Sequence, residues 1–299
     1  MSDTALLFRS VRAARSWVQA GAGRLETAQI AGCVTMRPGN DETPVFMVPG
    51  ATGSVLQLAP LAEAMTAPMP IYAIQPRGMS QGETPDQTLT EMAGHAIAVM
   101  RAVRAEGPYL LVGYSAGGLV TLEMAQQLTA AGQAVSLVVL LDTYPSHETW
   151  PLGCHFEILA RRALRSFGEL WRCTPRQIVA EVTRRVRSLL HYLAASGLRL
   201  VAPPPVVAEG TDAASRRVHL ATYDAGEAYR PTRYTGRVVF LQPAEVPNLE
   251  PRRPERVWGQ FLDDLVVRRV PGSHLGMMQG GAAATATEIC RCLAEVPTR

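Results

Sequence analysis

The chain has 299 residues, of which 47% are hydrophobic and 18% charged. This composition supplies a substantial apolar core and excludes an intrinsically disordered protein. The 29 basic residues are all arginine and face 26 acidic residues, so the formal net charge is only +3. That small excess argues against nucleic acid as a partner, and the lack of lysine excludes catalysis by a lysine amine.

The cysteine pattern and the hydropathy bear on the cellular location of the protein. Five scattered cysteines predict neither a disulfide framework nor a zinc site, and they favour a reducing, cytoplasmic location. The apolar run at residues 5–8 is too short for a secretory signal. No window approaches the roughly 20 apolar residues of a membrane span, so we expect no membrane contact.

Short apolar runs alternate with helical patterns through the first half of the chain. The expected strands are residues 45–48, 71–74, 109–112 and 137–141. The expected helices are residues 56–65, 89–103 and 119–131. Continuous apolar strands separated by helices predict an α/β fold with a parallel sheet covered on both faces.

The alternation stops at about residue 145, gives way to a mostly helical pattern, and returns after about residue 231. The expected later strands are residues 238–241 and 265–270, and the expected helices are residues 257–262 and 283–293. The simplest interpretation is one α/β domain over residues 43–299, interrupted by a helical insertion at about 145–231. Residues 1–42 precede the first convincing strand and form an expected N-terminal helical extension.

A candidate nucleophile lies between the third strand and its helix. Residues 113–117 fit the pattern G-x-S-x-G, with Ser115 at its centre. A strand before the pattern and a helix after it are the context of a nucleophile elbow, a strained turn that points the serine oxygen out of the sheet. The alternative interpretation is a glycine-rich strand-to-helix turn in which the serine is incidental.

A serine nucleophile needs a base, and His274 is the best-placed histidine. It follows the last expected strand, so its loop lies at the carboxyl edge of the sheet. His95 falls within a helical pattern and is expected to be a helix residue only. The order Ser…Asp…His is the one expected of α/β-hydrolases.

The orienting acid has two candidates. Asp142 ends the strand at residues 137–141, so its carboxylate would emerge at the same sheet edge. Glu245 follows the next strand and is the rival, with a solvated loop acid as its alternative interpretation. We favour Asp142.

Two backbone N–H groups are needed to stabilise a tetrahedral oxyanion. Ala116 follows the nucleophile and supplies the first. The loop after the first strand supplies the second, with Ala51 as the candidate donor and Gly50 as the residue that allows a substrate to approach the backbone closely.

Several segments together resemble a known family, the releasing thioesterase domains of nonribosomal peptide synthetases and modular polyketide synthases. These segments are residues 48–54, 71–78, 111–119, 140–145, 228–231 and 270–274. The similarity runs from about residue 44 to the C-terminus and is weakest in the insertion.

The resemblance implies an α/β-hydrolase fold in which the insertion is a helical lid. It implies that Ser115 is acylated, His274 is the base, Asp142 is the acid, and Ala51 and Ala116 form the oxyanion hole. Such enzymes accept an acyl chain from the phosphopantetheine thiol of an acyl or peptidyl carrier protein, and release it as an acid, lactone or lactam. The family needs no cofactor or metal of its own.

The substrate site is expected to include Gly50, Thr52 and Tyr114. The chain departs from the discrete editing thioesterases of these pathways, which usually carry a histidine before the serine and a methionine after it. Here those positions hold Tyr114 and Ala116, and Ser273 stands where the family often has Asp or Asn. Whether the chain is a discrete enzyme or an excised domain stays open.

Two other functions share the catalytic residues or the fold. One is a carboxylesterase or lipase that acts on oxygen esters, and the other is a non-catalytic binding module.

Two surface predictions accompany the leading interpretation. The arginine-rich segment 161–199 is a candidate docking face for an acidic carrier protein, although solvated lid helices explain it equally well. The N-terminal apolar stripe, with Leu7 and Val11, is a candidate homodimer contact.

Overall fold

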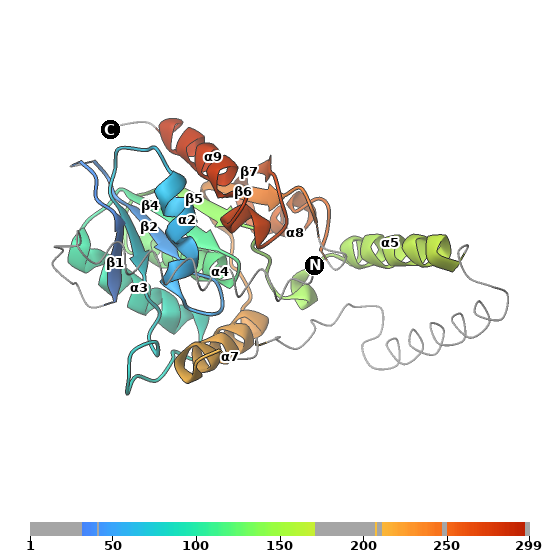
Figure 1. Cartoon of the computed structure of the whole chain (residues 1–299), viewed down its shortest axis with the longest axis horizontal. Helices are drawn as coiled ribbons and strands as arrows, with labels where there is room; N and C mark the ends of the chain where they lie inside the picture. Colours follow the sequence, from blue (N-terminus) through green and yellow to red (C-terminus); the bar gives the residue numbers. More distant parts are fainter. Residues whose placement is uncertain (1–31, 41, 171–206, 208–210, 247–249, 297–299) are drawn as a thin grey trace.

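The computed structural model of the chain describes residues 32–40, 42–170, 207, 211–246 and 250–296 (Figure 1). The N-terminal apolar stripe lies outside the described residues, and so does the arginine-rich segment from residue 171 onward. Neither of the two surface predictions is therefore addressed by the structure.

Seven strands form one sheet in the order β1-β3-β2-β4-β5-β6-β7. They are β1 (Cys33–Arg37), β2 (Val45–Val48), β3 (Ile71–Ile74), β4 (Tyr109–Tyr114), β5 (Val135–Leu141), β6 (Tyr234–Pro243) and β7 (Leu262–Val270). Neighbouring strands pair in parallel, except that β1 runs antiparallel to β3. The predicted α/β class with a mostly parallel sheet is confirmed.

Helices cover both faces of this sheet. The longer ones are α2 (Ala59–Ala64), α3 (Leu89–Val103), α4 (Ala116–Ala130), α5 (Leu152–Leu170), α7 (Ala213–Ala228) and α9 (Ala282–Ala294). The shorter ones are η1 (Val55–Leu58), η2 (His147–Thr149), α8 (Glu255–Trp258) and η3 (Gly276–Met278). Figure 1 shows α2 and α9 on one side of the sheet and α3 and α4 on the other.

The strands read as continuous apolar runs because both of their faces are buried. In β5, Leu137, Val139 and Leu141 join the core on the α2 and α9 side. Val138 and Leu140 join the core on the α3 and α4 side. Successive side chains of a strand point to opposite faces, so each position of a central strand must be apolar.

The structure corrects two boundaries. Residues 33–37 form the edge strand β1, so the N-terminal extension cannot reach to residue 42. An edge strand pairs on one side only and is partly exposed, which is why its apolar signal is weak. The helix predicted at residues 257–262 is only the single turn α8, because Leu262 already pairs with Tyr234 as the first residue of β7.

In the described part of the insertion predicted at about 145–231, the regular elements are all helices, namely η2, α5 and α7. In Figure 1, α5 extends away from the sheet, while α7 lies near α3 and α4. Within the described ranges, no helix combines the length and apolar character needed to cross a membrane. The carboxyl ends of β4, β5, β6 and β7 form one edge of the sheet, and the candidate residues lie there.

Candidate active site

Ser115 occupies a strained turn between β4 and α4. Its φ of 54° and ψ of −127° are rare for a residue with a side chain. The turn is held because the Ser115 N–H donates to the Leu141 carbonyl at 2.9 Å. A Cβ on Gly117 would lie 2.1 Å from the Pro49 oxygen, so only glycine allows the helix to start this close to the β2 loop.

His274 and Asp142 form a direct hydrogen bond, although 132 positions separate them in the chain. The His274 Nδ1–H donates to Asp142 Oδ2 at 2.7 Å. The Asp142 side chain is 1% exposed, whereas that of His274 is 33% exposed. The acid is therefore shielded from water while the outer side of the imidazole can reach a substrate. This bond fixes the tautomer that leaves Nε2 free to accept a proton.

Tyr114 holds the His274 loop next to the nucleophile. Its hydroxyl donates to the backbone oxygen of His274 at 3.0 Å, and its ring stacks on the imidazole with centroids 4.9 Å apart. Tyr114 directly precedes Ser115, so the end of β4 carries both the nucleophile and the support for the base. Burial, followed by the negative charges of Asp142 and Glu250, raises the pKa of Tyr114, so the phenol stays a donor.

The turn that carries Asp142 is tied to the serine turn. Asp142 also has a positive φ, 46°, and its N–H donates to the Leu241 carbonyl at 3.0 Å. The Thr143 hydroxyl donates to the Ser115 carbonyl at 3.0 Å. The indole of the buried Trp258 donates in turn to the Thr143 carbonyl at 2.9 Å. The Ser115 turn and the Asp142 turn are thus parts of one connected scaffold.

The predicted oxyanion loop lies against the nucleophile. A Cβ on Gly50 would be 3.4 Å from the Ser115 Cβ. Ala116 is the first residue of α4, so its N–H has no acceptor within the helix. The Ala51 N–H makes no hydrogen bond with any other described residue. Both amides are therefore available, and the start of a helix favours developing negative charge.

A small pocket of about 30 Å³ opens beside this loop. Gly50 and Gly117 form one side, and Val218 and Thr222 of α7 form another. Thus α7, which belongs to the insertion, closes over the space next to the nucleophile. A helix in the position of α7 can act as a lid that shapes a binding site for an acyl chain.

A second carboxyl group lies buried near Asp142. Burial and the charge of Asp142, opposed by Arg161, raise the pKa of Glu250 to about 8. Glu250 Oε2 and Asp142 Oδ1 are both buried, and neither has a hydrogen-bond partner among the residues that the structure describes. A neutral Glu250 avoids placing a second negative charge beside the acid of the site.

The remaining predicted residues fall in different places. Thr52 is exposed in the oxyanion loop. Tyr114 was expected to contact substrate, but it is 3% exposed and instead supports His274. Glu245 is exposed, and its N–H donates to the Gly272 carbonyl, whereas Asp142 is the acid that contacts His274. His95 lies in α3, where its Nε2 is 3.3 Å from the Gln75 oxygen.

Sequence reasoning missed three supporting residues. Thr143 follows the acid directly and could have been found by its position in the turn. Trp258 and Glu250 come from segments far along the chain, and no local pattern marks them. Only the packing of the loop before α8 against the ends of β5 and β6 brings them to the site.

Comparisons with known proteins agree with this geometry. The four-domain nonribosomal peptide synthetase holo-AB3403, bound to AMP and glycine, superposes with a TM-score of 0.62 at 22% identity, over 89% of this chain and 20% of that one. The NocB thioesterase domain, in covalent complex with a fluorophosphonate nocardicin G analogue, superposes with a TM-score of 0.56 at 26% identity, over 84% of this chain and 95% of that domain. These similarities identify the α/β-hydrolase type of fold.

A curated relative is the dimodular nonribosomal peptide synthase of Bacillus subtilis (strain 168). It is 42% identical over 112 residues, which are 38% of this chain and only 5% of that protein. This chain therefore corresponds to a small part of that relative. The family model for the thioesterase domain matches residues 43–294. The chain belongs to the thioesterase domain family, whose members are serine hydrolases.

Proposed function

We propose that this chain releases an acyl chain from the phosphopantetheine thioester of a carrier protein through an acyl-Ser115 intermediate. The single observation that carries the proposal is the 2.7 Å bond between His274 and Asp142 at the same sheet edge as the strained Ser115 turn. The family and the peptide synthetase relatives supply the class of substrate.

The first half of the reaction transfers the acyl group to the serine. His274 Nε2 takes the Ser115 proton as Oγ attacks the thioester carbonyl carbon. The resulting oxyanion accepts hydrogen bonds from the Ala51 and Ala116 N–H groups. The C–S bond then breaks, and His274 returns its proton to the departing thiolate.

The second half frees the product. Water gives a proton to His274 and attacks the acyl-serine ester. The second tetrahedral species then collapses to a carboxylic acid as His274 returns that proton to Ser115 Oγ, which frees the serine. A hydroxyl or amine within the acyl chain can replace water, in which case the product is a lactone or lactam. The small pocket beneath α7 is lined by Gly50 and Gly117, which flank Ser115, and this supports an approach of the acyl chain from the side of α7.

The partner is an acyl or peptidyl carrier protein, and the working compartment is the cytoplasm, as the scattered cysteines favour. Pairing of two copies through the N-terminal stripe stays a prediction. The mass of the protein in solution tests it, and a monomer would contradict it.

The test compares an acyl-pantetheine thioester with the matching oxygen ester. We expect faster turnover of the thioester and loss of both activities in Ser115→Ala. Preference for the oxygen ester would favour a carboxylesterase. Activity that survives in Ser115→Ala would contradict the proposed nucleophile.

A further inference from the structure

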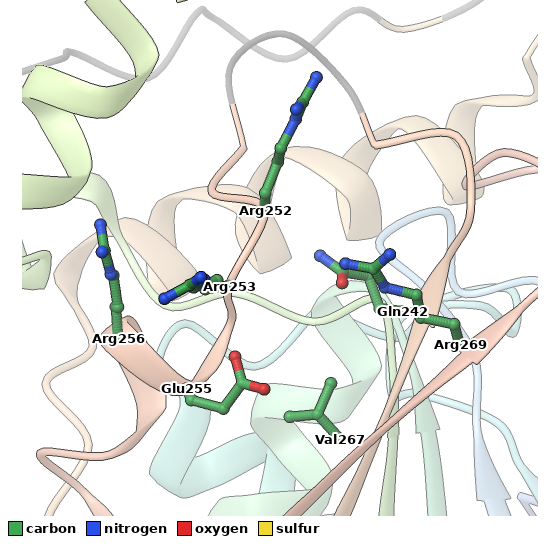
Figure 2. Close-up of a pocket in the computed structure, with 7 residues that line it drawn as sticks. All are labelled: Gln242, Arg252, Arg253, Glu255, Arg256, Val267 and Arg269. Atoms are coloured by element: carbon green, nitrogen blue, oxygen red, sulfur yellow. The ribbon is translucent and has the colours of Figure 1, made fainter.

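A second cleft, lined by arginines, lies outside the catalytic residues. Its volume is about 650 Å³, and it is formed by the segment at the start of α8 and by strands β6 and β7. Figure 2 shows the residues that line it. They are Gln242, Arg252, Arg253, Glu255, Arg256, Val267 and Arg269.

The charge of this cleft is strongly positive. Four arginines and one glutamate line the cleft, and in the described part of the chain only Arg256 of the four forms an ion pair, with Glu157 at 3.3 Å. Arg252, Arg253 and Arg269 are exposed, and none of them pairs with a carboxylate of a residue that the structure describes. Guanidinium groups bind phosphate oxygens well because they offer several donors in a fixed plane.

The cleft is firmly attached to the active-site edge of the sheet. Gln242 pairs with Arg269 across β6 and β7, and it is 1% exposed. Its Nε2 donates to the Pro251 carbonyl at 3.3 Å, which ties the arginine-bearing segment to β6. The backbone that carries Arg252, Arg253 and Arg269 is therefore attached to β6.

The distance from this cleft to the nucleophile follows from the sheet. Arg269 is on β7 and Ser115 follows β4, three strands away in the order β4-β5-β6-β7. Adjacent strands are separated by about 4.8 Å, so the backbones of Arg269 and Ser115 are roughly 14 Å apart across the sheet. A phosphopantetheine arm has about as many chain bonds as four peptide residues and spans roughly 15 Å when extended.

We propose that the cleft lined by Arg252, Arg253 and Arg269 binds the phosphate of the phosphopantetheine arm while its thioester lies at Ser115. The inference rests on the proposed function for its choice of ligand. The arginines hold the phosphate end of the arm, and the spacing across the sheet lets the sulfur reach the nucleophile. The site is a binding site and takes no part in bond making.

The test measures binding of two small molecules, phosphopantetheine and pantetheine, to the Ser115→Ala protein by titration calorimetry. They differ only in the phosphate. We expect phosphopantetheine to bind at least tenfold more tightly, and the difference to shrink with added salt. The double variant Arg253→Gln with Arg269→Gln should reduce the preference to less than twofold.

A matched control removes two charges from the opposite edge of the sheet. Arg101 and Arg104 lie at the end of α3, before β4 begins, and Arg101 is exposed. Arg101→Gln with Arg104→Gln should leave the preference unchanged. In protein with Ser115 intact, the cleft variant should raise KM for acyl-phosphopantetheine about tenfold, with kcat unchanged and with acyl-pantetheine unaffected.

The outcomes separate the two proposals. Equal binding of phosphopantetheine and pantetheine, or an equal loss in the control variant, would overturn the phosphate site. Inorganic phosphate binding as tightly as phosphopantetheine would assign the cleft to free phosphate and overturn the chosen ligand. An intact, arginine-dependent preference together with no hydrolysis of either thioester would contradict the proposed function while supporting the phosphate site.

Discussion

The Tyr114 hydroxyl donates to the backbone oxygen of His274 at 3.0 Å, while the ring of the same tyrosine stacks on the imidazole. The residue before the proposed nucleophile therefore positions the proposed base. Tyr114→Phe removes the hydrogen bond and keeps the ring. We expect kcat to fall about fivefold, with KM little changed, because the His274 loop loses a hydrogen bond worth about 1 kcal/mol. Steady-state kinetics measures both constants.

Tyr109 offers a matched control at the other end of the same strand. It is also buried, and its hydroxyl donates to the Ala105 carbonyl at 2.9 Å. Tyr109→Phe should lower the free energy of unfolding by a similar amount and leave kcat unchanged. If the two variants lose activity equally, Tyr114 has only a structural role.

The choice between the two candidate acids can be tested directly. Asp142→Asn keeps the size of the side chain, but its amide cannot stabilise the imidazolium that forms on His274. We expect kcat to fall by roughly 10³–10⁴-fold, as for the corresponding change in other serine hydrolases. Glu245→Gln, at an exposed loop position, should leave kcat unchanged. The opposite result would make Glu245 the acid.

Glu250 makes the stability of the protein depend on pH. Its pKa is raised from 4.5 to about 8, mainly by burial. Between these values the folded state keeps a proton that the unfolded state releases, so the free energy of unfolding falls as the pH rises. Between pH 5 and pH 8, we expect the free energy of unfolding of Glu250→Gln to fall by roughly 1–3 kcal/mol less than that of the unchanged protein. Urea unfolding at several pH values measures the slopes, and equal slopes would contradict the buried neutral acid.

Gly117 marks the closest approach of α4 to the oxyanion loop. A methyl group there would lie 2.1 Å from the Pro49 oxygen, and this backbone atom cannot move aside without a cost in free energy. Gly117→Ala should lower the free energy of unfolding by about 1–3 kcal/mol and reduce kcat by displacing the loop that carries Ala51. Gly94, on the exposed face of α3 with open space around it, is the control. Gly94→Ala should stabilise the protein by about 0.5–1 kcal/mol. Equal effects would contradict the packing argument.

The central strands and their helices were predictable because buried parallel strands leave a strong local signal. The strand at residues 71–74 and the helix at 89–103 were predicted with the bounds that the structure shows. The edge strand β1 was missed because its exposed face allows polar residues. The helix predicted at residues 257–262 extended too far beyond α8 because the apolar residues after this turn belong to β7.

The residues of the site differ in the same way, because some leave a local signal in the sequence and others do not. The strained turn at Ser115 could be predicted because Gly113 and Gly117 leave room for it, and the place of His274 at this sheet edge could be predicted because it follows the last strand. Tyr114 was assigned to substrate contact because a sequence does not show which way a buried ring points. Glu250 could not be predicted, because its pKa depends on burial against Asp142 from a segment more than 100 residues away.

The central claim is that the oxygen of Ser115 becomes acylated, and intact-mass spectrometry after rapid quenching with an acyl thioester tests it most directly. We expect a mass gain equal to the acyl group, located on the peptide that contains Ser115 and absent from Ser115→Ala. His274→Ala should slow its formation by several orders of magnitude. An adduct on another residue, or one that persists in Ser115→Ala, would contradict the account.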